Sequence, residues 1–352
     1  TVLFEVFVER RPLDPVVNAL LRAKKSMKSD RRQRFCDTVI GVFRWWGILR
    51  RLLHPEDLAI LDGRLRGPAA GEQVELRISD RSAAALLLGA LLLDEISEAH
   101  YRKEWSRLLG LRRLPERGRQ DSLFEYAEKV FAAIAEAMEY RQQRVQIIDG
   151  DIVPSWCESL LPEDFPWRKL VSWVQRRPPL WLRAQGIGAE QLCLELSHHG
   201  VAARCHEKVA EAVRIDPTRI NLYSLPQFRS GAFEIQDLAS QCIALVSSPQ
   251  PGERWWDPCA GAGGKTLALA AMMNNKGTIV AGDIRGYKLE DLRKRARRAG
   301  FSNIECREWD GKPLRRKQQG KFDGVLVDVP CSCSVTWRRN PDAKWNTSPQ
   351  EV

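Results

Sequence analysis

The feature that most constrains this chain is a change of sequence pattern near Gly231. Between Leu13 and Arg144, apolar residues recur at helical spacing and no strand-like alternation interrupts them. After Gly231, strand-like runs alternate with helical segments, in the order 254–256, 265–273, 278–281, 288–299, 303–307 and 322–327. Alternation of this kind predicts a parallel, doubly wound sheet with helices on its faces.

The 352 residues are too many for one typical domain, and the pattern divides them into three parts. We predict an all-α helical bundle over residues 1–146, a small α+β module over 147–230 and a Rossmann-like α/β domain over 231–352. The segment 35–53 is typical of the bundle, because its large apolar side chains fall on one face of a helix.

The middle module has short elements separated by prolines. A strand-like run, LWLRA, occupies 180–184. The segment 192–205 reads as a helix that enters a glycine turn and then a strand. His198 and His199 stand just before that turn. This position fits the C-terminus of a helix better than a metal site.

The net charge of +10 and the pI of about 9.3 favour polyanionic partners such as RNA. A basic surface that only keeps the protein soluble explains the charge equally well. No run reaches the roughly 18 apolar residues that a membrane span needs. The nine cysteines are scattered without C-x-x-C spacing, so we expect no metal site and no disulfide framework. Scattered free thiols fit a reducing cytoplasm, so we expect a cytoplasmic protein. We also expect a monomer.

The segment 253–270, ERWWDPCAGAGGKTLALA, reads as a strand ending at Asp257, a loop of small residues, and a helix beginning near Lys265. Glycines let the backbone approach a ligand, and the helix N-terminus offers unpaired N–H donors. The pattern predicts a cradle for a nucleotide or nucleoside. Cys259 stands where a P-loop needs glycine, and G-x-G-x-x-G is also absent. A plain structural turn is the alternative.

Two acidic residues follow the next strand-like runs. Asp283 closes the run in 277–289, about 20 residues beyond the glycine loop, where dinucleotide-binding sheets place the carboxylate that binds ribose hydroxyls. Asp310 closes the run in 303–311, at the same predicted sheet edge, and could accept a hydrogen bond from an adenine amino group. Asp283 could instead cap a helix, and Asp310-Gly311 could be an ordinary turn.

A fourth strand delivers Asp328 and Cys331 to that edge, in FDGVLVDVPCSCSVTWRRNPDAKW at 322–345. Methylation of an exocyclic amine usually employs an Asn/Asp-Pro-Pro-aromatic loop, but this loop carries a cysteine. A thiolate that adds to carbon 6 of cytosine makes carbon 5 nucleophilic enough to accept a methyl group. Cys331 could otherwise be a small packed residue. Arg338 and Arg339 suit contacts with RNA phosphates.

These motifs together resemble the Sun-type RNA (cytosine-5) methyltransferases, the bacterial class that acts on 16S ribosomal RNA. The resemblance rests on GAFEIQDLASQ at 231–241, DPCAGAGGKT at 257–266, Asp283, Asp310 and DVPCSCSVTWRRNPD at 328–342. Residues 35–53 also look like the NusB-type helical RNA-binding domain of that family, and 177–184 resembles the start of its small RNA-recognition module.

The resemblance implies S-adenosylmethionine as the cofactor and RNA as the partner. The residues it assigns to the methionine part of the cofactor are Pro258, Cys259, Ala260, Gly261, Ala262, Gly263, Gly264 and Lys265. Asp283 is assigned to the ribose, Asp310 to the adenine, and Asp328 to the reactive methyl and the cytosine. Cys331 matches the cysteine that assists product release.

Two departures from the family pattern stand out. Cys333 and Val335 occupy positions where glycine is usual, which predicts a stiffer catalytic loop. The family's attacking cysteine lies in a Thr-Cys-Ser segment further along, so we expect it beyond Val352. Only four of seven expected strands are visible. A non-catalytic RNA-binding protein that retains the methyltransferase fold and a transfer-RNA cytosine-5 methyltransferase stay open as alternatives.

Overall fold

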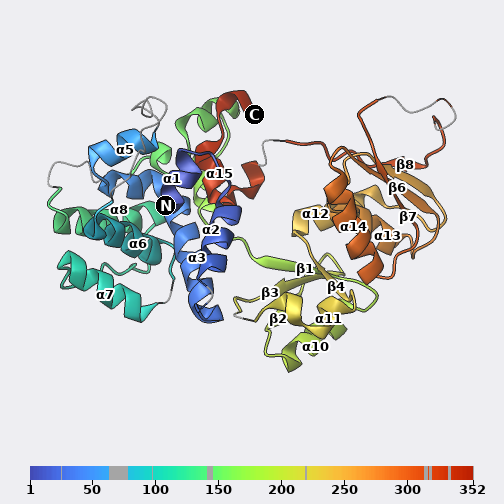
Figure 1. Ribbon diagram of the computed structural model, residues 1–352, viewed down its shortest axis with the longest axis horizontal. Coiled ribbons are helices and arrows are strands. Elements are labelled where there is room, and N and C mark those ends of the chain that lie inside the picture. The colour runs from blue at the N-terminus through green and yellow to red at the C-terminus, as the bar shows by residue number, and fades with distance from the viewer. Residues whose placement is uncertain are drawn as a thin grey trace. The chain divides into compact units, whose positions relative to one another are not determined.

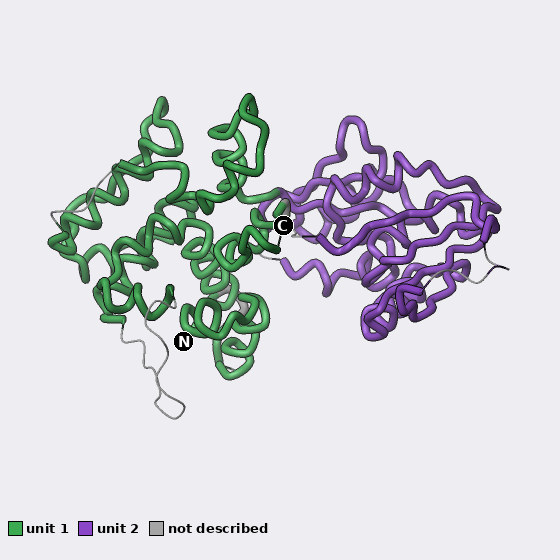
Figure 2. The backbone as a smooth tube through the Cα atoms, turned by 90° about the horizontal axis from the view of Figure 1, so that it is seen from above, with its two compact units in different colours: residues 1–178, 332–352 green, residues 179–331 purple. Residues whose placement is uncertain are grey.

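The computed structural model divides the chain into two compact units, residues 1–178 with 332–352, and residues 179–331 (Figure 2). The structure describes residues 1–24, 26–62, 78–96, 98–140, 146–218, 220–312, 316, 319–331 and 334–351, without the side chains of residues 29, 30 and 335. Among these residues, no helix is both long and apolar enough to cross a membrane.

The first unit is helical (Figure 1). Its α-helices are α1 (Val2–Phe7), α2 (Leu13–Ala23), α3 (Ser29–Arg44), α4 (Trp46–Leu49), α5 (Pro55–Leu61), α6 (Asp80–Leu93), α7 (Ala99–Leu109), α8 (Leu123–Ala137), α9 (Trp167–Val174) and α15 (Pro341–Asn346). Short 3-10 helices cover Arg50–Leu52, Asp149–Asp151, Ser155–Leu160, Ser334–Arg338 and Pro349–Glu351. Helix α6 is buried along most of its length, since Ala84 to Leu93 supply the centre of the core.

The expected helix over 35–53 is broken at Trp45, where α3 ends and α4 begins. In an unbroken helix, the side chains of two successive residues point about 100° apart. The indole rings of Trp45 and Trp46 are nevertheless both almost fully buried. The change of direction lets both rings enter the core. Gly47 follows directly, and a Cβ there would overlap the Asp151 backbone and the Trp345 ring.

The second unit contains two sheets. The first is antiparallel, in the order β2-β3-β1-β4, from β1 (Leu180–Ala184), β2 (Ala203–Cys205), β3 (Ala212–Ile215) and β4 (Phe233–Ile235). Helix α10 (Ala189–His198) packs on it, and α11 (Pro226–Arg229) precedes β4. His198 ends α10, as the sequence predicted.

The second sheet is parallel, in the order β7-β6-β5-β8. Its strands are β5 (Arg254–Asp257), β6 (Thr278–Asp283), β7 (Ile304–Glu308) and β8 (Gly324–Val325), and its helices are α12 (Leu238–Ser247), α13 (Gly264–Met272) and α14 (Gly286–Arg298). The predicted class is confirmed: a helical region, a small α+β module and a Rossmann-like parallel sheet follow one another along the chain.

The segment predicted as one domain, 231–352, is divided in the structure. Strand β4 pairs with β1 in the antiparallel sheet, and residues 332–352 belong to the helical unit. In Figure 1 the red helix α15 lies among the blue N-terminal helices. The functional limits of the domains stay a prediction.

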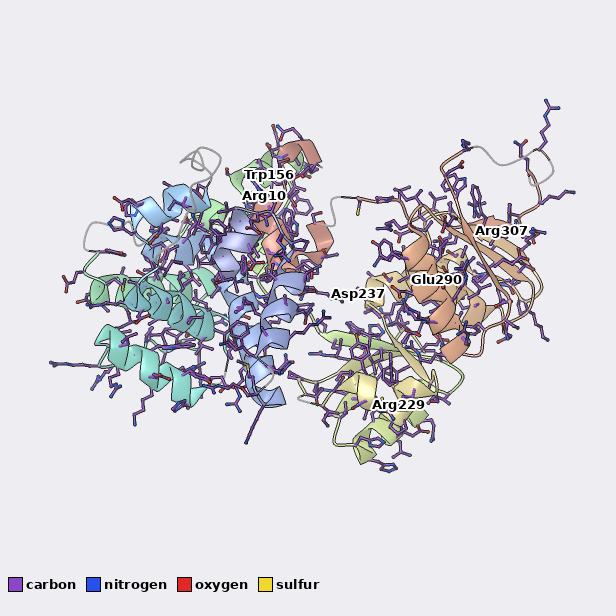
Figure 3. All side chains as sticks on the ribbon, in the orientation of Figure 1. Arg10, Trp156, Arg229, Asp237, Glu290 and Arg307 are labelled. Atoms are coloured by element: carbon purple, nitrogen blue, oxygen red, sulfur yellow. The ribbon has the colours of Figure 1, made fainter. Side chains whose placement is uncertain are left out.

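Buried side chains explain why the C-terminal residues join the helical unit. Lys344 is 1% exposed and donates to the Arg44 carbonyl at 3.0 Å and to Gln175 Oε1 at 2.9 Å. Trp337 packs edge-on against Trp156, which Figure 3 labels. The backbone N–H of Leu13 donates to Asp342, and the labelled Arg10 donates to Asn346.

We predict that Trp337→Ala destabilises the helical unit by about 3–5 kcal/mol, because truncating a buried tryptophan removes apolar contacts and leaves a cavity. Leu108→Ala is the control: this leucine is 52% exposed, and its loss should change stability by less than about 0.5 kcal/mol. Urea unfolding followed by circular dichroism measures both. Equal, small effects would show that Trp337 does not stabilise the unit.

Candidate active site

The loop between β5 and α13 lies at the carboxyl edge of the parallel sheet, and two hydrogen bonds tie it to β6. Ala260 N–H donates to the Gly282 carbonyl at 2.8 Å, and Gly261 N–H donates to Asp283 Oδ2 at 2.9 Å. Gly263 has φ of +87° and is the N-cap of α13. A Cβ at this position would overlap Leu292, so glycine is needed both for the backbone angle and for the packing.

Asp257 ends β5 beneath this loop and is almost fully buried. It accepts a hydrogen bond from Thr266 Oγ1 at 2.7 Å. Burial raises the pKa of Asp257 from its ordinary value of 3.8 to about 6, and the hydroxyl bond only partly opposes this shift. The residue therefore anchors the first turn of α13 to the strand at a cost in stability when its carboxylate is ionised.

Asp283 ends β6 and is also buried, at 3% exposure. Besides Gly261, its carboxylate accepts from the Arg285 backbone N–H at 2.9 Å and from the Arg285 guanidinium at 2.9 and 3.1 Å. These guanidinium bonds are the largest cause of a lowered pKa at Asp283. A sugar hydroxyl can reach the carboxylate only by replacing them. Arg285 can move away, because its side chain is about half exposed.

Asp310 lies two residues beyond Glu308, the register partner of Asp283 in β7. Its exposed carboxylate accepts from the backbone N–H of Lys312 at 3.1 Å and pairs with the Lys312 ammonium at 2.6 Å, which lowers its pKa. Trp309 lies between Glu308 and Asp310, and its backbone N–H donates to the Asp283 carbonyl at the end of β6. Asp283 and Asp310 therefore follow adjacent strands at the same edge.

Lys265 and Asp328 form an ion pair. Lys265 stands in the first turn of α13, and Asp328 follows β8, which pairs with β5 next to the loop. Cys331 is exposed, three residues further on. The predicted loop residues, Asp283, Asp310 and Asp328 thus follow neighbouring strands β5 to β8.

Apolar side chains are exposed along the same edge. Ile284, directly after Asp283, is 70% exposed, and Val327 and Val329, on either side of Asp328, are similarly exposed. An exposed apolar rim beside carboxylates and a glycine loop suits a ligand with both an apolar face and polar hydroxyl or amino groups.

The two arginines predicted to bind phosphate belong to the helical unit. Arg338 donates to the Arg176 carbonyl at 3.1 Å, and its guanidinium lies 4.0 Å from the Trp173 ring centroid. Burial lowers the pKa of both Arg338 and Arg339. Arg338 therefore packs against its own unit, and RNA contact by either arginine stays a prediction. Cys333 and the side chain of Val335 lie outside the described residues.

The sequence interpretation missed residues that support the loop from outside. Gln236 and Arg295 donate to loop carbonyls, and Glu234 holds Arg295. The sequence contains one indication of this support: Glu234 lies between two apolar residues of a strand, and a buried carboxylate needs a cation as its partner. Its partner Arg295 is 61 residues away and could not be identified from the pattern alone.

Residues 244–352 match the family described as 16S rRNA methyltransferase RsmB/F. The match is confined to this C-terminal part of the chain. The probable ribosomal RNA small subunit methyltransferase B of Synechocystis sp. is 28% identical over 60% of this chain and 49% of its own length. The ribosomal RNA small subunit methyltransferase B of Proteus mirabilis is 30% identical over 54% of this chain and 46% of its own length.

The chain therefore spans about half the length of these RsmB relatives. The crystal structure of PH0851 covers all of this chain and 78% of that one, with a TM-score of 0.66 and 19% identity, which supports the fold. The resemblance to the Sun-type family is thus confirmed where the RsmB/F match applies. Among the described residues, no group of three or more His, Cys, Asp or Glu side chains is placed to hold a metal ion.

We predict that Asp257→Asn makes the unit of residues 179–331 more stable by up to about 3 kcal/mol at pH 7.5, because an ionised carboxylate no longer has to be buried. Below pH 3.8 both folded and unfolded wild type are protonated. As pH rises to about 6, only the unfolded chain loses the proton, so wild-type stability falls.

The advantage of Asp257→Asn should therefore shrink between pH 6 and pH 4. Calorimetric unfolding over this pH range measures it, with Asp291→Asn, an exposed site on α14, as the control that should track wild type. If the stability difference between Asp257→Asn and wild type did not depend on pH, the raised pKa of Asp257 would be contradicted.

Proposed function

We propose that the protein transfers a methyl group from S-adenosylmethionine to carbon 5 of a cytosine in 16S ribosomal RNA. The observation that carries the proposal is the convergence of the glycine loop, Asp283 and the loop from Asp328 to Cys331 at one edge of an RsmB/F-type domain. The names of the relatives favour ribosomal RNA over transfer RNA as the substrate.

The chemistry of the side chains present fits the cofactor. Asp283 offers a carboxylate for ribose hydroxyls once Arg285 turns away, and Ile284 offers an exposed apolar face for the adenine. Lys265 offers a cation for the cofactor carboxylate, and Asp310 an acceptor for the adenine amino group. When bound, S-adenosylmethionine supplies an electrophilic methyl group.

A cofactor carboxylate near Lys265 would compete with Asp328 for the same ammonium group. We infer that cofactor binding releases Asp328 toward the cytosine, where its carboxylate can hold the exocyclic amino group. The Lys265–Asp328 pair would thus keep both side chains ordered until the two ligands replace it.

Two variants of neighbouring residues should change cofactor affinity in opposite directions. Asp283→Ala should weaken binding of S-adenosylhomocysteine by about 1–3 kcal/mol, because ribose hydroxyls lose their acceptor. Arg285→Ala should strengthen binding, because the carboxylate no longer has to exchange two guanidinium bonds for the ribose.

Isothermal titration calorimetry on both variants tests the assignment. Wild-type affinity in Asp283→Ala would overturn the ribose role of Asp283. Weaker binding by Arg285→Ala would show that Arg285 holds the carboxylate in its binding geometry instead of competing for it.

The proposed reaction uses two cysteines. A cysteine thiolate further along the family's pattern would add to carbon 6 of cytosine and push the electrons of the 5,6 double bond onto carbon 5. Carbon 5 would then form a bond to the methyl group that S-adenosylmethionine supplies, while the cofactor's sulfur keeps the electrons of the broken bond. A base removes the proton from carbon 5, the double bond re-forms, and the thiolate departs from carbon 6. Cys331 assists this last elimination, for which its exposure at the sheet edge is suitable.

We therefore expect Cys331→Ala in the full-length protein to accumulate a covalent protein–RNA adduct, because addition and methylation proceed while elimination stalls. The adduct appears as a band that resists denaturant on a gel of protein incubated with 16S ribosomal RNA and cofactor. Cys306→Ala is the control, since that half-buried thiol on β7 packs against apolar side chains of α13 and α14 and should not affect the adduct. Normal turnover of Cys331→Ala without adduct would make Cys331 a packing residue.

A further inference from the structure

The turn at Gly263 is held from both sides by side chains that lie outside the loop. Arg295, on α14, donates from Nη1 to the Ala262 carbonyl at 2.7 Å. Gln236, just after β4, donates from Nε2 to the Gly264 carbonyl at 3.0 Å. The carbonyls that precede and follow Gly263 are therefore both fixed in direction.

The buried carboxylate of Glu234 holds the side chain of Arg295. Glu234, on β4, is 3% exposed and accepts from Arg295 Nη2 at 2.9 Å. Its other oxygen pairs with Arg298, whose guanidinium lies 3.9 Å from the Phe228 ring centroid. A buried carboxylate is tolerated only when it is paired and hydrogen-bonded, so Glu234 fixes the position of both guanidinium groups.

A buried arginine orients Gln236, the second side chain that holds the turn. Arg183, on β1, is 5% exposed and donates from Nε to Gln236 Oε1 at 2.8 Å. Its Nη2 donates to Gln185 Oε1 at 2.6 Å. Because Arg183 can only donate, it turns the Gln236 oxygen toward itself and the Gln236 amide toward Gly264. Asp237, labelled in Figure 3, caps α12 directly afterwards and fixes the end of this segment.

We propose that Glu234, Arg295, Arg183 and Gln236 are positioning residues, through which the antiparallel sheet sets the geometry of the glycine loop for the cofactor. This inference rests on the proposed function of that loop. The N–H of a trans peptide points opposite to its C=O, so the bond to the Gly264 carbonyl fixes the direction of the Lys265 N–H. That N–H lies in the first turn of α13, where helices bind anions through unpaired donors.

We expect variants of these residues to lose cofactor affinity without a matching loss of stability. A loop that is ordered before binding does not lose conformational entropy when the cofactor arrives, so loosening it weakens affinity. Arg295→Met should weaken binding of S-adenosylhomocysteine about tenfold, which is the effect of roughly one hydrogen bond.

Arg298→Met is the matched control. Both variants remove one guanidinium from Glu234, but only Arg295 donates to the loop at Ala262. Arg298→Met should bind within about twofold of wild type, since a twofold change lies well below the effect of one hydrogen bond. Arg295→Lys is a second variant, which keeps a cation beside Glu234. Its single ammonium group cannot reproduce the guanidinium geometry that donates to Glu234 and Ala262 at once, so it should also weaken binding.

The experiment measures S-adenosylhomocysteine affinity by calorimetry, and hydrogen exchange of peptides covering 258–266 without ligand, for wild type and all three variants. We expect weaker binding and faster exchange in both Arg295 variants at a melting temperature similar to that of Arg298→Met. Equal losses in Arg295→Met and Arg298→Met, or unchanged exchange in the Arg295 variants, would overturn the positioning role. Failure of wild type to bind would overturn the proposed cofactor, while hydrogen exchange would still decide the positioning role.

Discussion

The hydrogen bond from the Gly261 N–H to the Asp283 carboxylate, with its neighbour from Ala260 to Gly282, joins the loop after β5 to the end of β6. It exists because adjacent parallel strands end at the same sheet edge. The site depends on it: the glycine loop, the acidic residues and the Asp328 loop each follow a different strand. The strand order β7-β6-β5-β8 brings them to the same edge.

Around this edge, several charges are buried and each is matched by a specific partner. Asp257 accepts a hydrogen bond from the Thr266 hydroxyl, but burial still raises the pKa of its carboxyl. Glu234 is neutralised by two arginines. Removing one partner from such a group leaves the buried charge only partly compensated, which costs stability.

The chain leaves this edge through Asp328 and Cys331 and continues into the helical unit. There Lys344 is fully buried next to Arg44, and burial lowers its pKa well below the ordinary range. Arg44 itself pairs with Asp94 and donates to the Arg338 carbonyl. The residues that follow the proposed catalytic loop are therefore anchored by the core of the N-terminal helices.

The sequence by itself determined the order of the elements and the placement of Asp257, Asp283 and the glycines at strand ends, because both follow from local periodicity and from the rule that parallel strands share one edge. It did not determine that β4 joins the antiparallel sheet or that Lys344 returns to the helical unit. Nor did it show that Arg285 covers Asp283 or that Arg295 fastens Ala262. These contacts are decided by which buried charge finds a partner once the chain is packed, and the partners of Lys344 and Arg295 lie tens to hundreds of residues away in sequence. Local pattern carries no information about pairing over such separations, whereas desolvation in the folded core makes it obligatory.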